Sequence, residues 1–142
     1  MPRRDLHPDL SDDETRALLE TGVEVFNAGR FFDSHEFFEE IWRSTNPEPR
    51  DLYQGLVQVA AGMYHWTVRG KAAPAARMLE RAVRRLEPFR SVATGVDVAG
   101  LLVALEPWQI WLNEPEGAAP EMPTMSTRPA ISRSLSRERD GS

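Results

Sequence analysis

Hydrophobic residues recur every three to four positions through most of the chain, which is the pattern that predicts amphipathic helices. Residues that favour turns separate the periodic segments from one another. The five predicted helices are residues 12–27, 34–45, 51–68, 74–89 and 98–106. The chain is therefore predicted to be all-α, with a compact bundle of about five helices.

The boundaries of these helices follow from capping residues and prolines. Ser11 and Glu14 have the spacing of a capping box, so the first helix is expected to begin between them. Asp33 or Ser34 is expected to cap the second helix. Pro74 suits the first position of the fourth helix, whereas Pro107 is expected to kink or end the fifth.

One face of each predicted helix is apolar and is expected to form the core. The expected core residues of the first two helices are Leu18, Leu19, Gly22, Val25, Phe26, Phe37, Phe38, Ile41 and Trp42. Those of the third helix are Leu52, Tyr53, Leu56, Val57, Val59, Met63, Tyr64, Trp66 and Val68. Those of the remaining segments are Ala75, Met78, Leu79, Ala82, Leu86, Phe89, Leu101, Leu102, Leu105, Trp108, Ile110, Trp111 and Leu112.

The same pattern divides the chain into three regions. Residues 1–10 are expected to be a flexible lead-in, residues 11–112 the helical domain, and residues 113–142 a disordered tail without a core-forming pattern. Residues 52–68 contain no charged side chain, but polar side chains and the limited length favour a central bundle helix over a membrane span.

Composition narrows the classes of function. The net charge of -5 and the pI near 5.2 argue against nucleic acid as a partner, and the Arg residues of the fourth helix are expected to form a solvated face. The absence of Cys excludes disulfides, thiolate nucleophiles and cysteine-ligated metals. No apolar run near the N-terminus resembles a signal peptide, so a cytoplasmic location is expected.

Residues 31–43, FFDSHEFFEEIWR, combine aromatic, acidic and imidazole side chains more densely than any other stretch. His35 and Glu39 lie at positions i and i+4 and are expected on the edge of the apolar face, whereas Glu36 and Glu40 are expected to face water. The third helix carries one polar stripe, which consists of Gln54, Gln58 and His65. Small residues beside that stripe would let another helix or a ligand come close.

Two kinds of chemistry suit this cluster. His35 and Glu39 could supply part of a divalent metal site, with His65 as a second nitrogen ligand, although the zinc protease motif requires His where Glu39 stands. Alternatively, Glu39, or His65 across the helix pair, could orient His35 for acid-base catalysis. The residues expected to line a pocket for a small ligand are Glu36, Trp42, Gln54, Gln58 and His65. Hydrolysis is the reaction class that such a pocket would suit.

A structural interpretation competes with these. The His, Glu and Gln side chains could satisfy one another's hydrogen bonds and fix the register of two helices, in a module that binds partners without catalysis. A contiguous exposed patch of Tyr53, Tyr64 and Trp66 would favour that alternative. The sequence leaves open whether the domain is an enzyme, and it identifies neither a substrate nor a cofactor.

Three spaced motifs resemble the family catalogued as domain of unknown function 309, whose members are small all-helical proteins. These motifs are Phe26-Asn27-x-Gly29, Ser34-His35-Glu36-x-x-Glu39-x-x-Trp42 and Gln54-Gly55-Leu56-x-Gln58-x-Ala60-Ala61-x-x-x-His65. The resemblance covers roughly residues 11–105 and implies a bundle in which the His-Glu helix faces the Gln-His helix. It implies no activity, and it raises the alternative that Glu36 caps a helix N-terminus.

Overall fold

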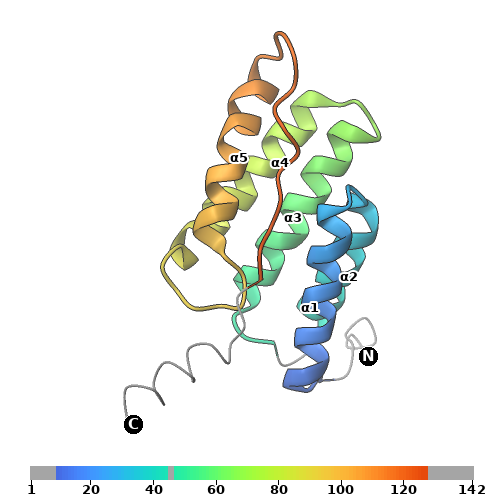
Figure 1. The fold of residues 1–142 in the computed structure, drawn as a ribbon, viewed down its shortest axis with the longest axis vertical. Coiled ribbons are helices and arrows are strands. Elements are labelled where there is room, and N and C mark those ends of the chain that lie inside the picture. The colour runs from blue at the N-terminus through green and yellow to red at the C-terminus, as the bar shows by residue number, and fades with distance from the viewer. Residues whose placement is uncertain (1–8, 45–46, 128–142) are drawn as a thin grey trace, which may run out of the picture.

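The computed structural model describes residues 9–44 and 47–127. Within them the helices are α1 (Asp12–Asn27), α2 (Phe31–Arg43), α3 (Arg50–Thr67), α4 (Ala72–Leu86), the 3-10 helix η2 (Glu87–Phe89) and α5 (Val98–Asn113). The prediction of an all-α bundle is confirmed. Each α-helix packs against the next one in the chain, which places α3 between α2 and α4 (Figure 1). No helix in the described ranges is long and apolar enough to cross a membrane.

The predicted capping box begins α1. The Glu14 backbone N–H donates to Ser11 Oγ at 3.0 Å, and the Ser11 backbone N–H donates to the Glu14 carboxylate at 2.8 Å. The α1 stripe is rotated slightly from the predicted one, because Val23 is buried while Leu18 and Val25 are only half-buried.

The predicted start of α2 is wrong. The helix begins at Phe31, ahead of both Asp33 and Ser34, and Arg30 precedes it without a side-chain cap. Burial of the Phe31 ring explains the earlier start, because that ring packs edge-on against Phe26 with centroids 4.9 Å apart. Ser34 is buried inside the first turns, where its hydroxyl donates to the Phe31 carbonyl.

Two helix boundaries differ from those that the prolines predicted. The predicted start of the fourth helix at Pro74 is wrong, because α4 begins at Ala72; Pro74 is its third residue, where the missing N–H costs no hydrogen bond because backbone N–H groups of the first turn have no intrahelical acceptors. The predicted end of the fifth helix at about Glu106 is wrong, since α5 continues through Pro107 to Asn113. The continuation buries Trp108 and Leu112, although Ile110 remains 68% exposed, against expectation.

Glycines let the helices approach closely. A Cβ added to Gly22 would lie 2.6 Å from the Phe38 ring of α2, and one added to Gly55 would lie 2.6 Å from Leu86 of α4. Gly62 is packed in the same way against Leu79. The small residues of α3 therefore let a helix, α4, pack closely against it.

The prediction of a disordered tail from Asn113 onward is wrong for residues 114–127. Figure 1 shows this segment running back along the bundle beside α5. Asn27 fixes it near its end, because the Asn27 amide donates to the Met125 carbonyl at 2.9 Å and accepts the Met125 backbone N–H at 2.8 Å. Met125 is buried, so the segment completes the core. Residues 1–8 and 128–142, which include most of the predicted lead-in and half of the predicted tail, lie outside the described residues.

We expect Asn27→Ala to lower the free energy of unfolding by about 1–3 kcal/mol, because it leaves the Met125 backbone N–H without its acceptor. Chemical denaturation measures the loss, and faster amide exchange at Met125 would place it in this segment. Asn113→Ala is the matched control, since the exposed Asn113 amide donates to the Gln109 carbonyl of its own helix and to no other described residue. Equal losses in both variants would contradict the role given to Asn27.

Candidate functional site

One exposed stripe of α2 carries the candidate chemistry. Its members are Phe32, His35, Glu36, Glu39 and Arg43; apart from the adjacent pair His35 and Glu36, each follows the one before it by three or four residues. The opposite face of α2 is buried through Phe31, Ser34, Phe38 and Ile41. These buried side chains therefore hold α2 against the core, and the stripe lies along the outer edge of the helix.

His35 lies between two carboxylates. Its Nδ1 is 3.8 Å from Glu36 Oε2, and its Nε2 is 3.7 Å from Glu39 Oε1. Both distances exceed those of hydrogen bonds, and the buried Nδ1 has no hydrogen-bond partner. The three residues can each offer one ligand atom such that all these atoms lie within 4.8 Å of one another. The predicted pairing of His35 with Glu39 is thus a close approach without a hydrogen bond.

Exposure differs along the cluster. The side chains of His35 and Glu39 are 24% and 26% exposed, whereas Glu36 is 59% exposed. Glu36 therefore faces water as predicted and still reaches the imidazole. The alternative role of Glu36 as an N-terminal cap is wrong, because α2 begins five residues earlier at Phe31.

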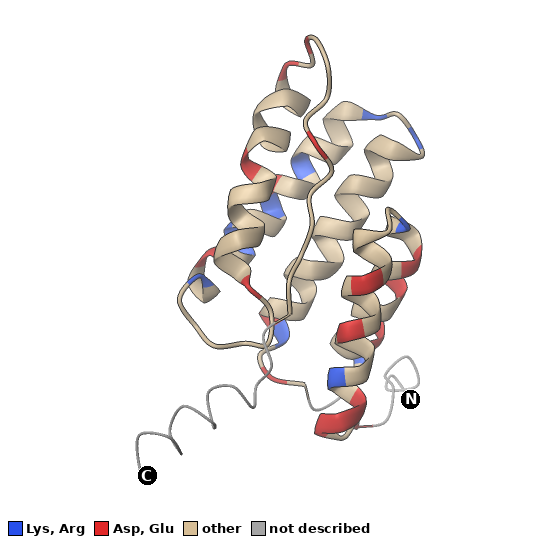
Figure 2. Cartoon of the chain, viewed as in Figure 1, with Lys and Arg blue, Asp and Glu red and all other residues tan. Residues whose placement is uncertain are grey.

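Arg43 supplies the positive charge of the stripe. Its Nη2 lies 3.4 Å from Glu39 Oε2, so Glu39 has a cation beside one oxygen and the imidazole beside the other. Figure 2 shows that acidic residues are concentrated along α1 and α2, whereas α4 carries several Arg. The cluster therefore lies on the more acidic side of the bundle.

The polar stripe of α3 does not join this cluster. Gln58 accepts a hydrogen bond from Arg85 of α4 at 3.3 Å, and Arg85 also pairs with Asp51 at 3.2 Å. His65 contacts the Tyr64 ring, and its buried Nδ1 has no hydrogen-bond partner. Gln54 is half-buried. In the described parts of the chain, no hydrogen bond connects these three residues to His35 or Glu39, so the helices pack together without uniting the predicted site.

Trp42 packs partly against the core, and the guanidinium of Arg50 lies 5.4 Å from its ring centroid. This cation-π contact gives the ring a structural role at the junction of α2 and α3. Tyr53 is buried, Tyr64 meets Phe32 of α2, and Trp66 meets Trp111 of α5. The contiguous aromatic patch that would favour an interaction module is therefore not formed by these residues.

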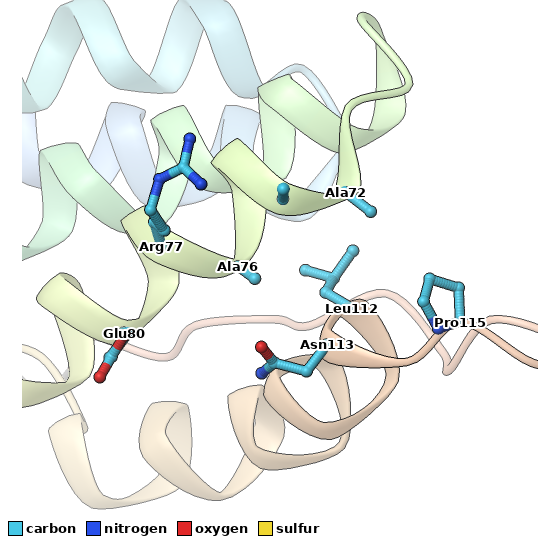
Figure 3. A pocket seen from close by; sticks show the side chains of 8 residues that line it. Ala72, Ala76, Arg77, Glu80, Leu112, Asn113 and Pro115 are labelled. Atoms are coloured by element: carbon cyan, nitrogen blue, oxygen red, sulfur yellow. The ribbon is translucent and has the colours of Figure 1, made fainter.

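Two hollows in the described surface lie away from the cluster. The first has a volume of about 360 Å³ and lies between α4 and the end of α5, with Ala72, Ala76 and Leu112 on its walls (Figure 3). Another of about 490 Å³ lies beside Trp111 and Pro120. Neither contains a residue of the predicted pocket, so a pocket between α2 and α3 has no support from them.

Sequence reasoning missed two side chains of the stripe. Phe32 precedes His35 by three residues and Arg43 follows Glu39 by four, spacings that place them on the same helix face. Phe32 was missed because the second helix was predicted to begin at residue 34, whereas α2 begins at Phe31. The helical periodicity around His35 was the signal that could have identified both.

Comparison with known proteins supports the resemblance seen in the motifs. The family model described as Domain of unknown function (DUF309) matches residues 19–78. The uncharacterized protein YpuF of Bacillus subtilis (strain 168) is 32% identical over 73 residues, which cover 51% of this chain and 41% of YpuF. The chain thus spans less than half the length of that relative. No solved structure matches.

The matched region contains the end of α1, all of α2 and α3, and the first turns of α4. It includes the candidate cluster on α2 and the polar stripe on α3. Residues 19–78 are therefore similar to the family described as Domain of unknown function (DUF309).

Proposed function

We propose that this small helical domain binds a divalent transition metal ion on α2, through His35 and Glu39 with the participation of Glu36. The observation that carries the proposal is the spacing of the ligand atoms. Two ligands about 2.1 Å from a tetrahedral ion are roughly 3.4 Å apart. The separation of 3.7 Å between His35 Nε2 and Glu39 Oε1 is close to that value and too long for a hydrogen bond.

The unpartnered imidazole nitrogen supports the same proposal. Metal-bound His residues usually donate their second ring N–H to a carboxylate or carbonyl. His35 Nδ1 is buried without a partner, yet Glu36 Oε2 lies 3.8 Å away. A small rotation would let Glu36 accept this N–H when Nε2 holds the metal. Glu36 would otherwise supply a third ligand oxygen itself.

The donor set indicates the class of metal. One imidazole and carboxylates suit zinc, manganese, iron or cobalt, and the chain has no thiolate that would select a softer ion. All three candidate ligands come from one helix, so water would complete the coordination of the ion where no other side chain does. A metal-bound water is the nucleophile that a hydrolytic reaction requires. Hydrolysis is accordingly the reaction class that this geometry suits.

The competing proposal is a non-enzymatic module whose polar cluster is structural. It relies on mutual hydrogen bonds among the His, Glu and Gln side chains. The described residues show no such bonds between α2 and the polar stripe of α3, and Gln58 is bonded to Arg85 instead. A buried imidazole nitrogen without a hydrogen-bond partner lowers the stability of the fold. A purely structural cluster therefore does not explain the presence of His35.

We expect the purified chain to bind Zn²⁺ or Mn²⁺ saturably in isothermal titration calorimetry, and both His35→Gln and Glu39→Gln to weaken the affinity at least about 100-fold. Mutation of residues that only support metal ligands typically lowers the metal affinity 10- to 100-fold, and the expected loss lies at the upper end of that range. Metal at 100 times its dissociation constant should also raise the free energy of unfolding by about 2.7 kcal/mol.

The matched controls are Glu40→Gln and His65→Gln, because these residues have the same chemistry and lie outside the three-residue cluster. They should leave the metal affinity within about twofold of the starting protein, as expected for sites that do not interact. Absence of saturable binding by the unmodified chain, or equal losses in the controls, would overturn the proposal.

A further inference from the structure

The ring of Phe32 begins the candidate stripe on α2. It is 52% exposed, although Phe31 beside it is buried in the core. Single exposed apolar residues are common and need no explanation by themselves. Phe32 is distinguished by its contacts, because its ring packs against both the imidazole of His35 and the ring of Tyr64 from α3.

The contact with His35 is a stack. The two ring centroids are 5.8 Å apart, and the ring planes are inclined by only 25°. The ring centroid of Tyr64 lies 5.5 Å from that of Phe32, and the two ring planes are inclined by 50°. Separations of this size are those of favourable aromatic pairs. Phe32 therefore connects the imidazole to α3, although the polar stripe of that helix does not reach the cluster.

We propose that Phe32 is a positioning residue that holds the His35 imidazole in the orientation required for metal binding. This inference rests on the proposed function. The terminal torsion of a His side chain has broad minima, so an imidazole at a helix edge can present either nitrogen to a neighbour. A ring stacked on one face of the imidazole restricts that rotation, and the orientation matters because His35 Nδ1 and Nε2 face different carboxylates.

Restricting the ring before the metal arrives should strengthen binding. A ligand that is already oriented loses less conformational entropy when it coordinates an ion. The packing of Tyr64 against Phe32 should add to the restriction, because it limits the freedom of the Phe32 ring. The structure thus assigns Phe32 an effect on metal affinity without contact with the metal itself.

The test compares Phe32→Leu, which removes the ring, with Phe32→Tyr, which keeps it. We expect Phe32→Leu to weaken Zn²⁺ binding about fivefold, a loss of the size expected for one aromatic contact, and Phe32→Tyr to restore the affinity to within about twofold. Nuclear magnetic resonance gives a second readout in the metal-free protein. The His35 ring protons should lose their ring-current shift in Phe32→Leu and keep it in Phe32→Tyr.

Ile110→Val is the control for loss of exposed apolar surface, because Ile110 is 68% exposed on α5, far along the chain from the cluster. It should change neither readout. Unchanged affinity in Phe32→Leu, or a loss in Phe32→Tyr equal to that in Phe32→Leu, would overturn the positioning role while leaving the metal site intact. No Zn²⁺ binding by the unmodified chain would overturn the metal site and the positioning role together.

Discussion

We expect Trp108→Ala to lower the free energy of unfolding by about 3–5 kcal/mol, the usual cost of truncating a buried Trp. The ring of Trp108 is fully buried on α5, and it lies edge-on to Trp111 with centroids 5.8 Å apart. Its Nε1 donates to the Glu121 carbonyl at 2.7 Å, which ties residues 114–127 to the helix. The substitution therefore removes a core side chain and an attachment of this segment together. Chemical denaturation monitored by circular dichroism measures the change.

Two variants separate these contributions. Trp108→Phe keeps most of the ring but loses the hydrogen bond to Glu121, so its cost should be smaller than that of Trp108→Ala. Ile110→Ala should change the free energy of unfolding by no more than about 0.5 kcal/mol, because that side chain is 68% exposed. A loss below about 1 kcal/mol in Trp108→Ala would mean that this end of α5 is not part of the core.

The second large effect is expected at the contact of α1 with α2. Gly22→Val should lower the free energy of unfolding by about 2–3 kcal/mol, because its new side chain overpacks a filled interface. The added Cβ alone would lie 2.6 Å from the Phe38 ring, and that ring is fully buried and cannot swing aside. Thermal and denaturant unfolding of the variant measure the loss.

Ala17→Val is the matched control, since Ala17 is exposed on the same helix and tests the lower helix propensity of a branched side chain. It should cost less than about 1 kcal/mol. If both variants were equally stable, α1 and α2 would have to be farther apart than in the structure.

Local interactions made a large part of the fold predictable. The α1 start followed from Ser11 and Glu14, because a capping box involves residues only three positions apart. The cluster on α2 could be anticipated for the same reason, since a helix brings residues at i and i+4 together wherever it lies in the protein. His35 and Glu39 are accordingly neighbours in the structure, as predicted, although they form no hydrogen bond.

Boundaries were less predictable where burial competed with capping and proline signals. Phe31 begins α2 ahead of two better caps because its ring packs on Phe26. Pro107 lies inside α5 because Trp108 and Leu112 beyond it are buried. In both places the apolar contacts outweigh the capping or proline signal. The local sequence pattern does not predict which residues make those contacts.

The sequence by itself determined the number of helices, the buried face of most of them and the acidic stretch that holds His35, because these features depend on short-range periodicity. Only the tertiary structure decided which partners the polar residues of α3 have. In it, Gln58 accepts a hydrogen bond from Arg85 of α4. The tertiary structure also placed residues 114–127 on the bundle through Asn27 and Met125, which are 98 positions apart. Contacts across such separations depend on how the helices pack, and no local pattern encodes them.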